Sequence, residues 1–231
     1  MLPIARKLRS YLHHVQFILP AAPVRILSAN EQQTTAWFDL NSFNLSVETP
    51  GEEVEDEEGI LQSMASLDTL LSELEAAAGL DPSRIILGGF SQGAAMTLLT
   101  GLTTAKRLAG LFVLSGRLPL RHKFASMVSP HAASLPIFWG HGTADPLVTH
   151  DLGHACAQFV MSEIGVPAAP KASLSSRILD WLDLKNVNAD RPAIPTGLSF
   201  RSYYGLRHEI GVPELDDLVL WLSALLPPRD S

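Results

Sequence analysis

Three side chains in this sequence are of the types that together perform nucleophilic catalysis. Ser91 lies within a G-x-S-x-G pattern at residues 89–93, and Asp145 and His208 follow it along the chain. A serine hydroxyl becomes a strong nucleophile only when a base removes its proton, and a histidine oriented by a carboxylate performs that task. The order serine, aspartate, histidine accompanies a nucleophile on a strand-to-helix turn. We therefore predict Ser91 as the nucleophile, Asp145 as the orienting carboxylate and His208 as the base.

The surroundings of Ser91 decide whether the pattern is significant. The apolar run 84–90 predicts a buried strand and residues 92–102 predict a helix, so a sharp turn must join them. Such a turn strains the backbone of the nucleophile, and we expect that only glycine avoids clashes at positions 89 and 93. The hydroxyl would then stand at the helix N-terminus, where developing negative charge is favoured. The alternative is a glycine-rich turn with an incidental serine.

Asp145 and His208 each follow a predicted strand, at residues 137–139 and 199–204. In open sheets of parallel strands, ligands and catalytic groups gather outside the carboxyl ends of the strands. The alternative for Asp145 is an ordinary turn-forming aspartate before a proline. His141 precedes Asp145, which violates the expected order, so we predict a structural role for it as a buried hydrogen-bonding residue.

The remaining candidates for metal or thiol chemistry are few. His150 and His154 lie four residues apart on a predicted helix, but no third ligand is evident, and a surface pair is the favoured interpretation. The single cysteine, Cys156, excludes a disulfide framework and any multi-cysteine metal site. We predict no metal and no organic cofactor.

The elements that must position these residues alternate between strand and helix. Because the predicted strands are apolar throughout, rather than at every second residue, they indicate a mostly parallel sheet with helices on both faces. The 231 residues suffice for one α/β domain over 1–231, with the proline-rich segment 166–195 as a surface insertion that includes a helical stretch at 175–185. The predicted strands are 15–19, 84–90, 111–114, 137–139 and 199–204, and the predicted helices are 1–12, 59–78, 92–102, 149–164 and 213–226.

Charge and hydropathy exclude several classes of function. The net charge is −7, and residues 52–58 hold six acidic side chains, which we predict to form a solvated loop before a helix. The lack of a basic surplus argues against nucleic acid as a partner. No apolar run reaches the roughly 18 residues needed to span a bilayer, and the first 12 residues lack the pattern of a signal peptide. We expect an intracellular protein in the cytoplasm, with the nucleus as an alternative.

The sequence resembles the acyl-protein thioesterase family, which comprises small α/β hydrolases of the lysophospholipase/carboxylesterase type. The resemblance implies an α/β-hydrolase fold, the three roles assigned above, and the backbone N–H of Gln92 as one donor to the oxyanion. It also implies acyl thioesters or esters as substrates. The matching motifs, in family order over most of residues 15–226, are Pro20-Ala21-Ala22-Pro23, Trp37-Phe38-Asp39, residues 88–94, Ser115-Gly116, Leu118-Pro119, His141-Gly142, Asp145-Pro146-Leu147-Val148 and residues 205–208.

Three departures from the family pattern bear on activity. Thr143 stands where the family usually has an acidic residue, and the segment 166–195 is longer than the usual connection. The family also opens with a strand and a His-Gly-Leu-Gly-Asp-like loop that supplies the second oxyanion donor, and this sequence begins after them. We expect a sheet without that first strand and loop, and at most weak activity.

The three residues predict a serine hydrolase, and the family resemblance implies that it hydrolyses long-chain acyl thioesters on protein cysteines. The alternatives are a carboxylesterase or lysophospholipase acting on small esters or lipids, and a weakly active or non-catalytic acyl-binding protein. S-acylated proteins or acyl esters are the expected partners, with at most transient contact with a membrane surface. The sequence does not determine the oligomeric state. The residues predicted to line the acyl site, for which a core role is the alternative, are Trp37, Phe38, Leu118 and Pro119.

Overall fold

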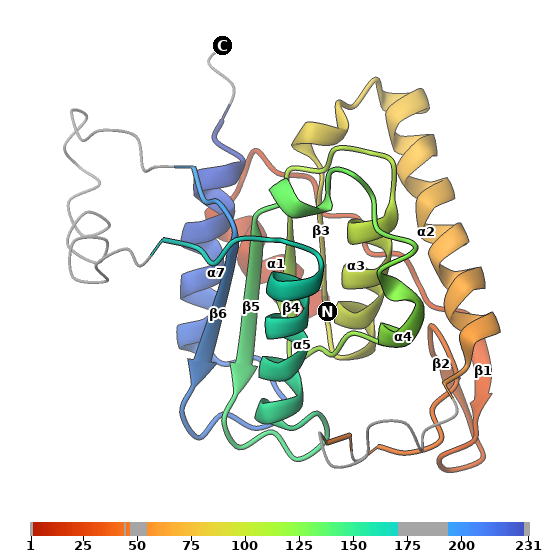
Figure 1. The fold of residues 1–231 in the computed structure, drawn as a ribbon. Helices are drawn as coiled ribbons and strands as arrows, with labels where there is room; N and C mark the ends of the chain where they lie inside the picture. Colours follow the sequence, from red (N-terminus) through yellow and green to blue (C-terminus); the bar gives the residue numbers. More distant parts are fainter. Residues whose placement is uncertain (1, 44, 47–54, 171–193, 229–231) are drawn as a thin grey trace.

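A parallel sheet of four strands forms the centre of the computed structural model, which describes residues 2–43, 45–46, 55–170 and 194–228 (Figure 1). The strand order is β3-β4-β5-β6, and all three neighbouring pairs are parallel. The predicted parallel sheet is therefore confirmed. The strands are β3 (Ile86–Phe90), β4 (Gly110–Leu114), β5 (Ile137–Gly142) and β6 (Leu198–Tyr203).

Helices cover both faces of this sheet, as the alternation of elements predicts (Figure 1). One face carries α2 (Glu57–Ala78), α3 (Gln92–Thr103) and α5 (His150–Glu163), and the other carries α1 (Leu2–Tyr11) and α7 (Val212–Leu225). Short helical segments complete the connections; they are η1 (Pro82–Arg84), α4 (Arg121–Phe124) and η2 (Ala132–Ser134).

The two faces of the sheet pack into separate apolar cores. Successive side chains of a strand point to opposite faces, so Leu111 and Val113 of β4 belong to the core with α2, α3 and α5, whereas Leu114 belongs to the core with α1 and α7. In β5, Trp139 and Phe138 divide between the cores in the same way. A strand buried on both faces needs apolar side chains at every position, which explains the continuous apolar runs.

The segment between α1 and α2 differs from the prediction. Residues 15–19 are not a strand, although Val15 and Phe17 pack against the core that α1 and α7 share. Instead, β1 (Val24–Leu27) and β2 (Gln32–Thr35) form an antiparallel hairpin in a stretch that contains none of the predicted strands or helices. Both strands are largely exposed and β2 is polar throughout, so the alternation of apolar and polar residues that signals a strand is missing.

The free edge of β3 borders an apolar cavity of about 350 Å³. Its walls come from β3, α1, α2 and residues 15–20. Within the parts of the chain that the structure describes, no strand pairs with this edge. The predicted insertion at 166–195 is described only at its two ends, and its helical stretch at 175–185 lies outside the described residues.

The acidic run before α2 is not simply solvated. Asp56 caps α2, where its carboxylate accepts a hydrogen bond from the Gly59 N–H at 2.9 Å. Glu55 lies 2.5 Å from Arg117 Nη1 and accepts the Leu120 N–H at 2.7 Å. The prediction of a solvated loop is therefore wrong for Glu55, because its carboxylate joins the run to the connection after β4. Residues 52–54 lie outside the described residues.

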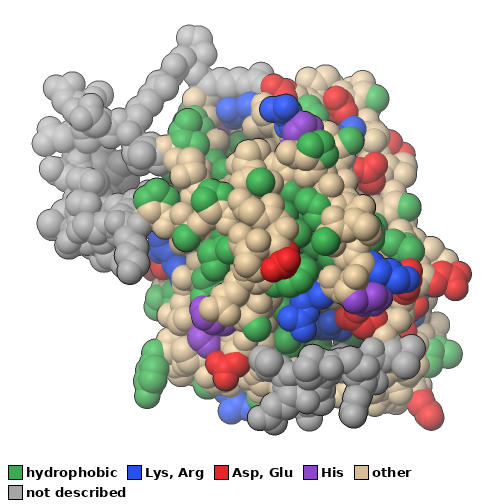
Figure 2. Space-filling model, viewed as in Figure 1, with side chains coloured by type: hydrophobic (Ala, Val, Ile, Leu, Met, Phe, Trp, Pro, Cys, Tyr) green, Lys and Arg blue, Asp and Glu red, His purple; other side chains and the backbone are tan. Residues whose placement is uncertain are grey.

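Charged side chains of both signs are mixed on the face that Figure 2 shows. Lys123 pairs with Glu57 at 2.5 Å. Among the described residues, no helix combines the length and the apolar character that a membrane crossing requires.

Candidate active site

Ser91 occupies the sharp turn between β3 and α3, as predicted. Its backbone has φ 55° and ψ −120°, a conformation that costs energy for a residue with a side chain. The Ser91 N–H donates to Leu114 O at 2.9 Å, and the N–H groups of Ala94 and Ala95 donate to Ser91 O. These bonds hold the strained turn and leave the hydroxyl at the first turn of α3.

The two glycines beside Ser91 differ in what they contribute. A Cβ at Gly89 would lie 2.3 Å from the carbonyl carbon of Gly93, so only glycine lets the strand pass this close to the helix. A Cβ at Gly93 would meet nothing nearer than Trp37 Nε1, at 3.9 Å. The expectation of a steric need for glycine is confirmed at position 89 and wrong at position 93, where a Cβ would make only an ordinary van der Waals contact.

Asp145 and His208 are brought together by two loops that run side by side beyond β5 and β6. The Thr143 N–H donates to Tyr203 O at 3.0 Å, and the Gly205 N–H returns a bond to Thr143 Oγ1 at 2.9 Å. The Ala144 N–H then donates to Leu206 O at 3.0 Å. Thr143, which departs from the family pattern, thus joins the loop of Asp145 to the loop of His208.

The three predicted residues form a continuous chain of hydrogen bonds. His208 Nδ1 lies 2.8 Å from Asp145 Oδ2, and His208 Nε2 lies 2.8 Å from Ser91 Oγ. A carboxylate can only accept hydrogen bonds, so the Nδ1 atom of a neutral His208 carries the hydrogen and Nε2 is free to accept one from the serine hydroxyl. This is the arrangement that a general base needs in order to receive the serine proton.

Asp145 is held as an anion by its hydrogen bonds. Burial alone would raise the pKa of Asp145, but the hydrogen bond from His208 and the Val148 and Leu147 N–H groups outweigh it, so the pKa lies below its usual value. Both N–H groups donate to Oδ1, at 3.0 and 2.9 Å, which leaves Oδ2 for His208. The Asp145 side chain therefore combines the turn-forming role, which was the alternative interpretation, with hydrogen bonding to His208.

Two further side chains flank this chain of hydrogen bonds, and only one of them, His141, was predicted from the sequence. The ring of Phe90 packs against His208 with centroids 4.8 Å apart, which restricts the imidazole from the side of β3. His141 is fully buried, and its Nε2–H donates to Val148 O at 2.9 Å. Burial lowers the pKa of His141, against the hydrogen bond to Val148 and the charge of Asp145, so its ring is neutral. The structural role predicted for His141 is confirmed.

Comparisons with known proteins agree with this geometry. The phospholipase/carboxylesterase family model matches residues 4–171. The chain belongs to the phospholipase/carboxylesterase family. Acyl-protein thioesterase 1 of Cryptococcus neoformans is 35% identical over 226 residues, which cover 97% of this chain and 86% of the relative. Acyl-protein thioesterase 1 of Mycosarcoma maydis is 37% identical over 229 residues, with 96% and 82% covered.

Solved structures of similar proteins share the fold of this phospholipase/carboxylesterase family member. Arabidopsis thaliana SOBER1 superposes with a TM-score of 0.77 at 27% identity, covering 97% of this chain and 90% of that one. Zea mays acyl-protein thioesterase 2 superposes with a TM-score of 0.65 at 25% identity, covering 96% and 88%. The fold is that of an α/β hydrolase, and the protein is a hydrolase of the thioesterase and esterase class.

The residues predicted to line the acyl site occupy different environments in this family member. Phe38 and Leu118 are 2% and 1% exposed and belong to the core, and Pro119 is buried as well. Trp37 is half-buried and borders the apolar cavity along β3. Trp37 is thus the member of the predicted set that a substrate can most easily reach, while the alternative core role fits Phe38 and Leu118.

His150 and His154 lie four residues apart on α5. Their rings stack with centroids 6.3 Å apart, and His150 Nε2 lies 2.8 Å from Ser202 Oγ. Across the described residues, no three histidine, cysteine, aspartate or glutamate side chains are grouped so that they could hold a metal ion.

Proposed function

We propose that this protein is a serine hydrolase that cleaves long-chain acyl groups from cysteine thioesters on proteins. The observation that carries the proposal is the chain of two 2.8 Å contacts from Asp145 through His208 to Ser91 Oγ. Hydrogen bonds in this order activate a serine hydroxyl for acyl transfer. The relatives named acyl-protein thioesterase 1 support a protein thioester as the substrate.

The reaction proceeds in two halves. Ser91 Oγ attacks the acyl carbon while His208 Nε2 takes the hydroxyl proton, and His208 then donates that proton to the departing thiolate of the substrate cysteine. A water molecule gives a proton to His208 and attacks the acyl-enzyme, which releases the fatty acid and restores Ser91. Asp145 keeps the Nδ1–H tautomer of His208 in place and stabilises the imidazolium that forms in each half.

The backbone N–H of Gln92 is the donor that we assign to the oxyanion. Gln92 is the first residue of α3, where backbone N–H groups have no partner inside the helix. The helix dipole adds to the stabilisation of negative charge at this point. Because an oxyanion accepts stronger hydrogen bonds than a ground-state carbonyl, such a donor lowers the barrier to reaction.

The proposal is tested with a fluorophosphonate probe, whose phosphorus mimics an acyl carbon under attack. We expect the probe to label wild-type protein at Ser91 and to leave Ser91→Ala unlabelled, with the circular dichroism spectrum of the variant unchanged. Absence of labelling in folded wild-type protein would favour the alternative of a non-catalytic acyl-binding protein. Equal labelling of both proteins would overturn the assignment of Ser91.

A second candidate function is hydrolysis of small carboxylic esters or lysophospholipids, and the family's description as phospholipase and carboxylesterase favours it. The same three residues serve both reactions, so the substrates must be compared directly. We expect kcat/KM for a palmitoyl-thioester peptide to exceed that for a short p-nitrophenyl ester. A reversed preference would favour the esterase. Cytoplasmic or nuclear location, and transient contact with membranes that carry S-acylated proteins, accompany the first proposal.

A further inference from the structure

The side chain of Gln92 joins the turn of Ser91 to a distant segment of the chain. Gln92 Oε1 accepts the Trp37 N–H at 2.7 Å, and Gln92 Nε2 donates to Phe38 O at 2.6 Å. The carboxamide therefore uses its acceptor and its donor on consecutive residues, 55 and 54 positions away in sequence. Only one orientation of the amide satisfies both bonds. The reverse orientation would place the amide oxygen against Phe38 O and the amide NH₂ group against the Trp37 N–H.

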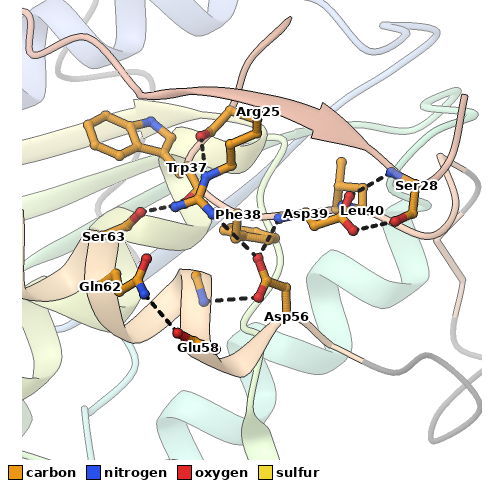
Figure 3. Close-up of polar contacts among 12 residues, drawn as sticks. Arg25, Ser28, Trp37, Phe38, Asp39, Leu40, Asp56, Glu58, Gln62 and Ser63 are labelled. Carbon is orange, nitrogen blue, oxygen red and sulfur yellow. Dashed lines mark hydrogen bonds and ion pairs between the residues drawn. The ribbon is translucent and has the colours of Figure 1, made fainter. Parts of the chain in front are cut away.

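Within the part of the chain that the structure describes, the segment from Trp37 to Asp39 pairs with no strand, and side chains hold it instead (Figure 3). Ser63 Oγ of α2 donates to Trp37 O, and Asp56 Oδ2 accepts the Asp39 N–H at 2.8 Å. Two of these anchors belong to α2 and its cap, and the third is the Gln92 carboxamide on α3. Of the three, only Gln92 is adjacent to Ser91 in the sequence.

This attachment places the indole of Trp37 beside the Ser91 turn. Apart from the adjoining residues and the backbone of α3 itself, Trp37 Nε1 is the nearest atom to the position that a Cβ at Gly93 would occupy, at 3.9 Å. Trp37 is half-buried and borders the same cavity as Phe90 and Gly93, which flank Ser91. The hydrocarbon chain of an acyl group bound to Ser91 would therefore extend from the turn beside Trp37, whose backbone is hydrogen-bonded to Gln92 of that turn.

We propose that the Gln92 side chain is a positioning residue that determines the selectivity for long acyl groups by holding Trp37 against the Ser91 turn. This inference rests on the proposed function and adds to it, since the oxyanion donor assigned above is the backbone of Gln92 and not its carboxamide. A side chain that replaces Gln92 leaves the backbone N–H in place but loses both bonds to the 37–38 segment.

Gln92→Met tests the proposal because methionine has a similar length and no amide. We expect the ratio of kcat/KM for a palmitoyl-thioester peptide to kcat/KM for an acetyl-thioester peptide to fall at least tenfold, mainly through a higher KM for the long substrate. Gln62→Met is the matched control, since the one hydrogen bond of the Gln62 amide among the described residues is to exposed Glu58, at 3.0 Å. An unchanged ratio in Gln92→Met, or an equal fall in Gln62→Met, overturns the proposal.

A double-mutant cycle shows whether Gln92 acts through Trp37. If it does, Trp37→Ala lowers the same ratio, and adding Gln92→Met to Trp37→Ala lowers it less than threefold further. Independent effects that multiply in the double variant would overturn the proposal. Gln92→Glu supplies the measurement if Gln92→Met does not fold, because it keeps the acceptor for the Trp37 N–H and loses the donor to Phe38, and we expect a smaller fall in the ratio.

Hydrogen exchange of the Trp37 amide tests the two hydrogen bonds from the Gln92 carboxamide to the 37–38 segment, here called the clamp, separately from the proposed function. We expect exchange to be at least tenfold faster in Gln92→Met than in wild type, because the acceptor is lost, and unchanged in Gln62→Met. Equal exchange in wild type and Gln92→Met overturns the clamp even if Ser91 is labelled by the probe. Faster exchange together with an unlabelled wild-type protein would instead mean that the clamp exists and the proposed function is wrong.

Discussion

Asp145 and His208 are 63 residues apart in the sequence, yet Asp145 Oδ2 and His208 Nδ1 lie 2.8 Å apart at the ends of β5 and β6. The backbone bonds between the two loops fix this distance, and the Val148 and Leu147 N–H groups occupy the other carboxylate oxygen. Asp145 is therefore oriented before any substrate binds. The tautomer of His208, and with it the basicity available to Ser91, depends on this one contact.

Replacement of Asp145 by asparagine keeps the shape of the side chain and removes its charge. An amide can present its NH₂ group to His208 Nδ1 and so stabilise the wrong tautomer, in which Nε2 carries the hydrogen. We expect kcat for thioester hydrolysis to fall by about 10⁴ at pH 7. The measurement is steady-state turnover normalised to folded protein, and a loss below tenfold would contradict the role of Asp145.

Ser91 and His208 should act as one unit. Each of the variants Ser91→Ala and His208→Ala is expected to lower turnover by about 10⁴–10⁶, and the double variant should lose little more. Multiplicative losses would contradict a shared role. His141→Ala provides a comparison, because His141 holds Val148 O and faces Asp145 Oδ2 at 3.7 Å without touching Ser91. A larger loss in His141→Ala than in His208→Ala would mean that the wrong histidine has been assigned as the base.

The glycines at positions 89 and 93 should tolerate substitution very differently. Gly89→Ala places a Cβ 2.3 Å from the Gly93 backbone, so the turn must open, and we expect a loss of stability of about 1–3 kcal/mol together with loss of turnover. Gly93→Ala meets only Trp37 Nε1 at 3.9 Å, and we expect stability within about 0.5 kcal/mol of wild type. Urea unfolding of both variants tests this contrast, and equal destabilisation would contradict it.

Glu214 should make the protein less stable as the pH rises towards neutrality. This side chain is fully buried in the first turn of α7, and its only hydrogen bond among the described residues is from the Gly211 N–H at 3.3 Å. Burial raises the pKa of Glu214 from 4.5 to about 7, with the Gly211 bond opposing the rise and the charge of Asp217 adding to it. The folded protein therefore holds a proton that the unfolded chain has released.

Between pH 4.5 and about 7, the folded state binds more protons than the unfolded state at this position, so its contribution to stability decreases as the pH rises and is lost above pH 7. The cost at pH 8 is on the order of 3 kcal/mol. Glu214→Gln removes the titration, and we expect it to raise the Tm by several degrees at pH 8 and by little at pH 5. Asp216→Asn, at an exposed position of the same helix, is the control and should leave this pH dependence in place.

The sequence by itself was sufficient to predict the parallel sheet and the candidate site. The strands at 111–114 and 137–139 are buried on both faces, so their composition reveals them without any knowledge of their neighbours. Ser91, Asp145 and His208 could be predicted together because each follows a predicted strand, and parallel strands end at the same edge of the sheet. The order of these residues along the chain then assigned a role to each.

The tertiary structure alone decided the contacts between segments that have no regular pattern. Three such contacts join residues across loops. They are the hairpin of β1 and β2, the ion pair of Glu55 with Arg117, and the hydrogen bonds of the Gln92 carboxamide to the 37–38 segment. Such contacts depend on the path of the backbone in space, and a single polar side chain that bonds a distant backbone group leaves no periodic signal in the sequence. For the same reason, only the structure shows that Gly89 must be glycine for close packing while a Cβ at Gly93 would make only an ordinary van der Waals contact.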